Sequence, residues 1–363
     1  FLDRPGDELY FLKRRHFLHN DVLLIQPRPK HVQNLCRILG LTSASKVKET
    51  PLPTGPNPID LDVRPLDPER SGMFRTCVGI LLYLAADVHP AQYGIKVLEQ
   101  QMSAPTEGGL KCLKHLASFL RGTASHAVAF EPPASGCGVI MQDGHDGKEV
   151  LELYTDSDWN GDKQSRRSTS SSYIFLNKHL LYSSSRAQRG VSLSSCGSEY
   201  QAAVSGSCDL LFVAAAITFV FRCEVDQRLL LDSSAARGVM TRVGCGALKH
   251  ISGKLLRLQQ KVKEEVLKPR PVGTAVNPSD LGTKSLGKAR ARGLMHLCYI
   301  FDTDEDCYVG ASDAEELWRQ NDARKEGRKI AKVLRGYGNQ HALLQPSASS
   351  LLAALAVFAT SLQ

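Results

Sequence analysis

Two carboxylates placed two residues apart are the first sign of chemistry in this sequence. Asp156 and Asp158 follow a run, residues 149–154, in which polar and apolar side chains alternate with the period of a half-buried β-strand. Side chains at i and i+2 of a strand point to the same face, so the two carboxylates are expected to lie together. Neighbouring carboxylates repel each other and resist ionisation unless a cation lies between them. The pattern is therefore typical of a metal-dependent hydrolase.

Further acidic residues stand at the ends of other predicted elements. Asp232 ends an apolar run, and Glu199 and Asp280 stand in the first turns of predicted helices. Strand ends of one sheet meet at one edge, and helices packed on that sheet can bring their N-termini to the same edge. Together with Asp156, these residues could hold two magnesium ions, which prefer oxygen ligands. Glu199 and Asp280, each taken singly, fit the role of a helix cap or dipole partner as well.

The elements that position these residues predict a layered α/β domain. The order is three strands, a helix, a strand, two helices, a strand and a helix. Strands are expected at 149–154, 173–176, 180–184, 229–232 and 272–276, and helices at 195–220, after 233, at 254–267 and from 277.

The first part of the chain predicts a small, mostly helical module. Two short apolar runs, 10–14 and 22–25, predict a hairpin joined by a polar turn. Apolar residues at helical spacing predict helices at 31–39, 74–84, 93–102 and 106–120. The Gly, Pro and Asp content rises over 132–148, which predicts a linker before the second domain.

Composition sets limits on the class of protein. The 363 residues include 42% hydrophobic side chains, enough for two ordinary domains, and the net charge of +8 fits either an anionic partner or a solvated surface. Ten scattered cysteines without a C-x-x-C pair disfavour zinc and disulfide frameworks and indicate a reducing compartment. The chain begins at Phe1 without an initiator Met or a signal peptide, as a piece of a longer protein would. The apolar run 351–362 is too short to span a membrane, so no membrane partner is expected.

Six ordered motifs in the second part resemble those of one family. Tyr154 to Trp159 matches a Y-T-D-x-D-W strand, and Arg166 to Ser170 matches an R-R-S-T-S segment. S-S-x-x-x-E-Y and K-H-I are matched at 194–200 and 249–251. C-D-N-x-x-A corresponds to 231–236 and A-D-x-x-T-K-x-L to 279–286, where this chain has Leu231, Ser233 and Ser279 in place of Cys, Asn and Ala. Upstream, residues 78–84, 102–106 and 119–123 resemble V-G-x-L-x-Y-L, M-x-x-P-T and Y-L-K-G-T. These motifs belong to copia-type LTR-retrotransposon polyproteins, and the chain resembles their C-terminal part.

This resemblance implies the division of the chain. Residues 1–131 correspond to the C-terminal part of the reverse transcriptase, which is thumb- or connection-like, and 132–148 to the linker. Residues 149–293 correspond to the ribonuclease H domain, with a layered mixed sheet and flanking helices. Residues 294–363 form a charged helical and apolar tail to which the resemblance gives no role.

The resemblance also implies the activity. The chain would be an endonuclease that hydrolyses the RNA strand of RNA–DNA hybrids during reverse transcription. Asp156, Glu199, Asp232 and Asp280 would be both the catalytic set and the ligands of two Mg²⁺ ions, with Mn²⁺ as a substitute. The partners would be the hybrid and the rest of the reverse transcriptase. Its place would be the cytoplasm, in a virus-like particle, or the nucleus.

Other residues receive supporting roles. Arg166, Arg167 and Lys284 are expected to meet phosphates, and Ser233 to contact the 2′-hydroxyls of the RNA strand. Two residues stand beside the metal ligands: Asp158, as a supporting carboxylate or a substrate contact, and His250, as a proton carrier. A solvated loop pair is an equal alternative for the two arginines, and a buried core histidine for His250.

Departures from the family pattern define a second hypothesis. No two aspartates are adjacent, so the paired-Asp metal motif of the polymerase is missing and no polymerase activity is expected. Residues 87–90 replace the usual T-R-P-D, and Ser171 replaces the Gly of S-T-S-G. The alternative is a catalytically inactive, decayed or domesticated retrotransposon remnant that at most binds nucleic acid.

Overall fold

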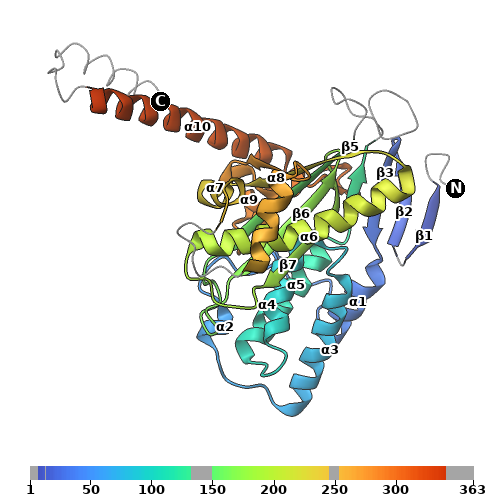
Figure 1. Cartoon of the computed structure of the whole chain (residues 1–363). Coiled ribbons are helices and arrows are strands. Elements are labelled where there is room, and N and C mark those ends of the chain that lie inside the picture. Colours follow the sequence, from blue (N-terminus) through green and yellow to red (C-terminus); the bar gives the residue numbers. More distant parts are fainter. Residues whose placement is uncertain (1–6, 13, 132–148, 245–252, 341–363) are drawn as a thin grey trace, which may run out of the picture. The chain divides into compact units, whose positions relative to one another are not determined.

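The computed structural model describes residues 7–12, 14–131, 149–244 and 253–340 (Figure 1). Two compact units divide the chain after Leu317. The first unit holds both sheets and all the residues discussed as a candidate site. The second begins at Trp318 within helix α10, Ala311–Gln340.

The first sheet is built from both ends of the first unit. Its strands are β1 Glu8–Phe11, β2 Arg14–His19, β3 Val22–Pro27, β4 His126–Phe130, β10 Ile300–Asp302 and β11 Cys307–Tyr308, in that spatial order and all antiparallel. Asn20 and Asp21 make the two-residue turn between β2 and β3 with φ of 48° and 64°, as the turn of a twisted hairpin requires. The sequence predicted one strand over 10–14, but the chain turns at Leu12, where φ is 47°, and makes two.

The predicted helices of the first part are confirmed. They are α1 Pro29–Ile38, α3 Pro68–Leu84, α4 Gln92–Gln100 and α5 Glu107–Gly122, joined by the short α2 Pro58–Leu61 and the 3-10 helix η1 His89–Ala91. The side chains of Asp67 and Thr106 cap α3 and α5 by accepting main-chain N–H groups. Leu35, Phe74 and Leu113 are fully buried where these helices meet.

The second sheet has β5 at its centre. Its order is β7 His179–Ala187, β6 Thr169–Leu176, β5 Glu149–Asp158, β8 Val225–Leu231 and β9 Lys268–Pro271. The first three strands form an antiparallel meander, and β8 and β9 run parallel to β5. The predicted mixed sheet with flanking helices is therefore confirmed.

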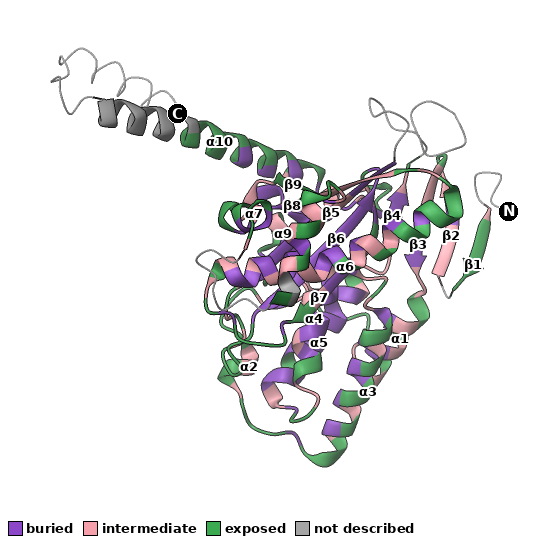
Figure 2. Ribbon diagram, viewed as in Figure 1, coloured by how far each residue is buried: buried purple, intermediate pink, exposed green. Residues whose placement is uncertain are grey.

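Both faces of this sheet are covered, as Figure 2 shows for its buried strands. On one face, helix α6 Ser195–Phe221 packs over β5, β6 and β8, where Ile174 and Leu176 join its core cluster. On the other face, Tyr173 and Phe175 join the core of the N-terminal helices. Alternate residues of one strand thus belong to two cores, which ties the N-terminal helices to the second sheet.

Helix α6 is long and apolar enough to cross a membrane, which the sequence did not lead us to expect. The apolar run considered there, 351–362, was judged too short to span one and lies outside the described residues. Its inward side chains, among them Tyr200 and Leu210, are fully buried against the sheet, so α6 is a core helix in this structure. Its C-terminal half nevertheless leaves Phe212 and Phe219 exposed.

The segment after β8 differs most from the predictions. It contains α7 Ser234–Thr241, η2 Gly253–Leu256, α8 Arg257–Lys263, β9, η3 Thr274–Val276, η4 Pro278–Gly282 and α9 Lys288–Leu297. The strand expected at 272–276 lies earlier, at β9, whose Pro269 and Pro271 suit an edge strand. The helix expected from 277 is the 3-10 turn η4, capped by Asn277.

Candidate metal centre

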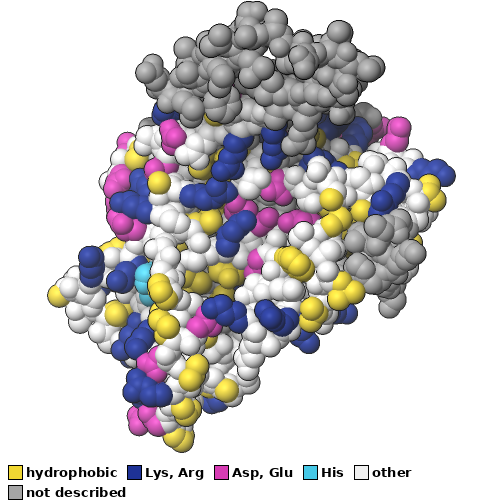
Figure 3. All heavy atoms as spheres, turned by 90° about the vertical axis from the view of Figure 1, so that its left-hand side faces the viewer, with side chains coloured by type: hydrophobic (Ala, Val, Ile, Leu, Met, Phe, Trp, Pro, Cys, Tyr) yellow, Lys and Arg dark blue, Asp and Glu magenta, His cyan; other side chains and the backbone are white. Residues whose placement is uncertain are grey.

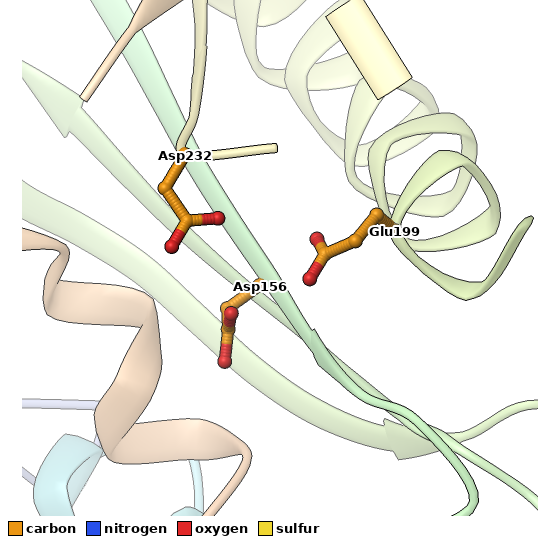
Figure 4. A group of neighbouring side chains, drawn as sticks. All are labelled: Asp156, Glu199 and Asp232. Atoms are coloured by element: carbon orange, nitrogen blue, oxygen red, sulfur yellow. The ribbon is translucent and has the colours of Figure 1, made fainter. Parts of the chain in front are cut away.

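Three carboxylates from three separate elements meet at the carboxyl end of β5. Asp156 lies on β5, Glu199 in the second turn of α6, and Asp232 directly after β8. Each offers one oxygen, and these oxygens lie within 4.8 Å of one another (Figure 4). The parallel pairing of β5 with β8 brings the two aspartates together, and α6 begins above them.

The electrostatics of this trio favour a cation. Burial, together with the negative charges of the neighbouring Asp156 and Asp232, raises the pKa of Glu199 to about 9. The Oε2 atom of Glu199 is buried and has no hydrogen-bond partner among the described residues. A buried acceptor without a donor is costly, and a metal ion would supply the missing partner. Carboxylate oxygens are the ligands that hard divalent cations prefer, so Asp156, Glu199 and Asp232 fit such an ion.

Hydroxyl groups hold the two aspartates in place. The Thr283 hydroxyl donates to Oδ2 of Asp156, and the Thr274 hydroxyl donates to Oδ2 of Asp232 at 2.8 Å. Both threonines follow β9, and Thr283 is fully buried. Partners of this kind fix the orientation of a ligand and are part of most metal sites.

Asp280 lies beside the trio but is already paired. Its carboxylate is buried on η4, and Lys284 Nζ lies 2.8 Å from its Oδ1 and 3.3 Å from Asp156 Oδ2. Oδ1 of Asp280 and Oδ2 of Asp156 thus contact the same ammonium group, which places the two carboxylates side by side. Arg290 binds Oδ2 of Asp280 from α9. The structure thus brings all four predicted acidic residues into one neighbourhood, with Asp280 facing protein cations.

Lys284 is the internal counter-ion of this side of the site. Burial alone would lower the pKa of its ammonium group, but Asp156 and Asp280 outweigh burial and raise it. Its side chain is 43% exposed, so the ammonium also reaches solvent. The sequence predicted a phosphate contact for Lys284, and in the structure its described partners are the two carboxylates.

The remaining predicted residues have varied positions. Asp158 ends β5 and accepts the main-chain N–H of Thr169, while burial raises the pKa of its carboxyl. Ser233 caps α7, its hydroxyl accepting the N–H of Ala236 at 3.2 Å.

Arg166 and Arg167 lie exposed in the loop after β5, Arg166 with a φ of 58°. His250 lies outside the described residues.

Sequence reasoning missed three residues that contact the acidic side chains. Thr274, Thr283 and Arg290 come from η3, the turn after η4, and α9. Thr283 stood inside a recognised motif, next to Lys284, and could have been chosen from it. Arg290 carried no signal, because ten residues and a turn separate it from Asp280.

Figure 3 shows acidic side chains gathered near the middle of one face, with Lys and Arg side chains around them. Lys and Arg side chains on a surface can attract an anionic partner.

Similar proteins were found by sequence. The chain is 27% identical over 256 residues to the retrovirus-related Pol polyprotein from transposon RE1 of Arabidopsis thaliana, which covers 69% of this chain and 16% of that protein. It is 29% identical over 236 residues to the corresponding polyprotein from transposon RE2 of the same plant, over 64% of this chain and 15% of the relative. The matched stretch thus spans about a sixth of these relatives. No protein-family model matches the chain.

Solved structures similar to part of the chain were also found. The N-terminal RNase H domain of rv2228c from Mycobacterium tuberculosis is 18% identical, with a TM-score of 0.27. The match covers 37% of this chain and 90% of that domain.

Proposed function

The chain is a homologue of the retrovirus-related Pol polyproteins of copia-type transposons, and from this premise we propose that its second sheet carries a ribonuclease H. The reaction would be metal-dependent hydrolysis of the RNA strand of an RNA–DNA hybrid. The observation that carries the proposal is the trio Asp156, Glu199 and Asp232, whose oxygens converge within 4.8 Å. The buried Glu199 Oε2, without a described donor, supports it.

The protein's own groups would bind and orient the reacting atoms. Asp156, Glu199 and Asp232 would hold the ion, and only oxygen donors face it, which favours Mg²⁺ with Mn²⁺ as a substitute. When bound, such an ion activates a water molecule and stabilises the leaving oxygen of a phosphodiester. Thr274 and Thr283 would keep the aspartates from turning away. Main-chain groups and hydroxyls facing the wide minor groove would distinguish RNA from DNA.

Asp280 would become available to a second cation only when Lys284 moves away from it. In the structure the Lys284 ammonium balances Asp156 and Asp280 together, and its partly exposed stem leaves it free to turn toward solvent. A phosphate of the hybrid offers that ammonium another anion. Once Lys284 turns to it, Asp156 and Asp280 would face each other with surplus negative charge, which favours a second cation between them. Arg290 would keep Asp280 in place.

A cleavage assay with strand-specific labels tests the proposal. The purified chain should cut the RNA strand of a labelled RNA–DNA hybrid with Mg²⁺, leave the DNA strand intact, and stop with EDTA. Asp156→Asn should abolish cutting because it removes a ligand charge. Asp209→Asn is a matched control. Asp209 lies on α6 like Glu199, about 15 Å further along the helix, and pairs with Arg186 of β7. If the wild-type chain leaves the hybrid uncut, the nuclease proposal is wrong, and the chain is a catalytically inactive remnant.

A further inference from the structure

A cavity of about 630 Å³ lies between the N-terminal helices and the loop that follows β5. Tyr93, Lys96 and Gln100 of α4 line one wall, and residues 161–165 with Arg167 line the other. Asp60 of α2 also lines the cavity and forms an ion pair of 2.6 Å with Lys163 of the loop. The cavity thus lies where the first module meets the sheet that carries the acidic site.

The residue of this cavity that indicates a bound ligand is Lys96. The residue is only 6% exposed, and its ammonium donates one hydrogen bond, to Thr169 Oγ1 at 2.6 Å. The ammonium also lies 5.4 Å from the centroid of the Tyr93 ring. Among the described residues, no carboxylate lies within ion-pairing distance of it. The carboxylates of Asp158 and Asp162 act on its charge only from beyond ion-pairing distance. A buried cation that forms no ion pair is costly, and an anion in the cavity would stabilise it.

The acidic residues of the cavity are already balanced. Asp60 is paired with Lys163. Asp162 accepts the N–H groups of Gln164 and Ser165 at 2.9 and 3.2 Å and the Ser165 hydroxyl at 2.5 Å. The Gln100 amide of α4 also donates to Asp162 Oδ2, at 3.3 Å, so the carboxylate is held from both walls. The charges left facing the cavity are then Lys96, deep inside, and Arg167, exposed at its edge.

The cavity is continuous with the strand that carries the acidic site. Thr169, which accepts the Lys96 hydrogen bond, donates its own N–H to Asp158. Gly161 lies so close to Asp158 that an added Cβ would come within 2.0 Å of its carboxylate, and Gly161 also lines the cavity. Asp158 is two residues from Asp156, about 7 Å along an extended strand. A nucleic-acid strand at the metal centre can therefore extend into the cavity.

We propose that this cavity binds a phosphate of the nucleic-acid strand whose neighbouring nucleotides occupy the metal centre. Lys96 would neutralise the phosphate from within and Arg167 would contact it from the edge. Such a contact holds the strand in register and carries no sequence information. The inference rests on the proposed nuclease function for the identity of the strand. It assigns the N-terminal module a part in holding the substrate of the second sheet.

The salt dependence of hybrid binding tests the assignment. Binding of a fluorescent RNA–DNA hybrid of two helical turns is measured by anisotropy over a range of salt, with Ca²⁺ in place of Mg²⁺ to slow cleavage. Lys96→Met keeps the length of the side chain and removes its charge. It should lower the slope of log Kd against log salt by about 0.9, the loss of one phosphate contact. Lys96→Arg should keep the slope.

Lys178→Met is the matched control, because it removes one charge from the β6–β7 turn at the other end of β6 from Thr169. Its slope should equal that of the wild type. Arg167→Gln should also lower the slope, and because Arg167 is exposed, this variant should fold normally. Circular dichroism shows whether Lys96→Met is folded. Wild-type slopes for both Lys96→Met and Arg167→Gln would overturn the proposal.

Two further outcomes separate the hypotheses. If inorganic phosphate at constant ionic strength stabilises the wild type but not Lys96→Met, while hybrid slopes are equal, the cavity holds a free anion and the strand assignment is wrong. If the slopes change as expected but the wild-type chain never cuts the hybrid with Mg²⁺, the cavity assignment stands and the nuclease proposal is the one that fails.

Discussion

At the scale of single residues, the acidic neighbourhood is unevenly balanced. Lys284 and Arg290 neutralise Asp280 and one side of Asp156. Glu199 and Asp232 on the other side have no cation within ion-pairing distance among the described residues. Burial and the charges of Asp156 and Asp232 raise the pKa of Glu199. This asymmetry indicates where an ion is needed in the resting protein. It also makes Lys284 a competitor for any cation that binds between Asp156 and Asp280.

Replacing Lys284 with Met should therefore increase the effect of Mg²⁺ on stability. Without Mg²⁺ the variant should lose about 1–2 kcal/mol, less than the 3–5 kcal/mol typical of a fully buried pair because Lys284 is 43% exposed. Added Mg²⁺ should then raise its melting temperature by more than that of the wild type, since the ion replaces the missing charge. Thermal unfolding with and without Mg²⁺ measures both effects. Equal shifts in the two proteins would show that Lys284 does not compete.

At the scale of elements, the approach of η4 to β6 sets the position of Asp280. Ser171 on β6 is the register partner of Asp156, and a Cβ added at Gly282 would lie 2.2 Å from the Ser171 hydroxyl and 2.8 Å from its Cβ. The Ser171 hydroxyl is buried and has no hydrogen-bond partner among the described residues. The family motif has glycine at the position of Ser171. The contact between Gly282 and residue 171 is therefore tighter in this chain than it would be with the family's glycine.

Gly282→Ala should destabilise the chain by roughly 1–3 kcal/mol, the usual cost of overpacking. In a Ser171→Gly background the same substitution should cost less, because both atoms that the new methyl group would meet are gone. Urea unfolding of the four proteins gives the coupling free energy, expected at about 1 kcal/mol or more. Additive effects of the two substitutions would contradict the close approach.

Most long elements could be predicted from local pattern, and the exceptions have physical reasons. Local pattern predicted β5 from its alternating side chains, α6 from its long, largely apolar run, and the N-terminal helices from apolar residues at helical spacing. It failed at η4, where Asn277 caps a start as expected but the turn ends at Gly282, pressed against Ser171. The acidic trio could be predicted from residue type and motif. Lys96 could not, because its partner Thr169 lies far away in the sequence, and Arg290 could not, because no motif links it to Asp280 across the intervening turn.

At the scale of the whole first unit, the N-terminal helices and the second sheet share a buried junction. His89 of η1 is 6% exposed, its Nδ1 lies 2.7 Å from the Ser183 hydroxyl of β7, and its carbonyl accepts the Tyr173 hydroxyl at 2.9 Å. Strand β10, late in the chain, returns to pair with β4 in the first sheet. Neither contact could be predicted from the sequence, because the paired residues lie more than 80 positions apart and no local pattern indicates such a pairing.

The junction predicts how stability depends on pH. Burial, helped by Arg14, lowers the pKa of His89 to about 4 from the ordinary value of 6.5. Between these values the unfolded chain binds more protons than the folded one, so stability falls as pH drops from about 6.5 to about 4, by up to about 3 kcal/mol. His89→Gln should flatten this slope. Urea unfolding of both proteins across that range measures the difference, and parallel curves would rule out His89 as the source.

The central claim, that the acidic trio is a metal-dependent nuclease centre, is tested most directly by Asp232→Asn. The substitution keeps the shape of the side chain and its bond to Thr274 but removes the charge that would hold a metal ion. With Mg²⁺, cleavage of a labelled RNA–DNA hybrid should fall by orders of magnitude, while hybrid binding stays or tightens and Asp209→Asn behaves as the wild type. Equal cleavage by wild type and Asp232→Asn would contradict the account.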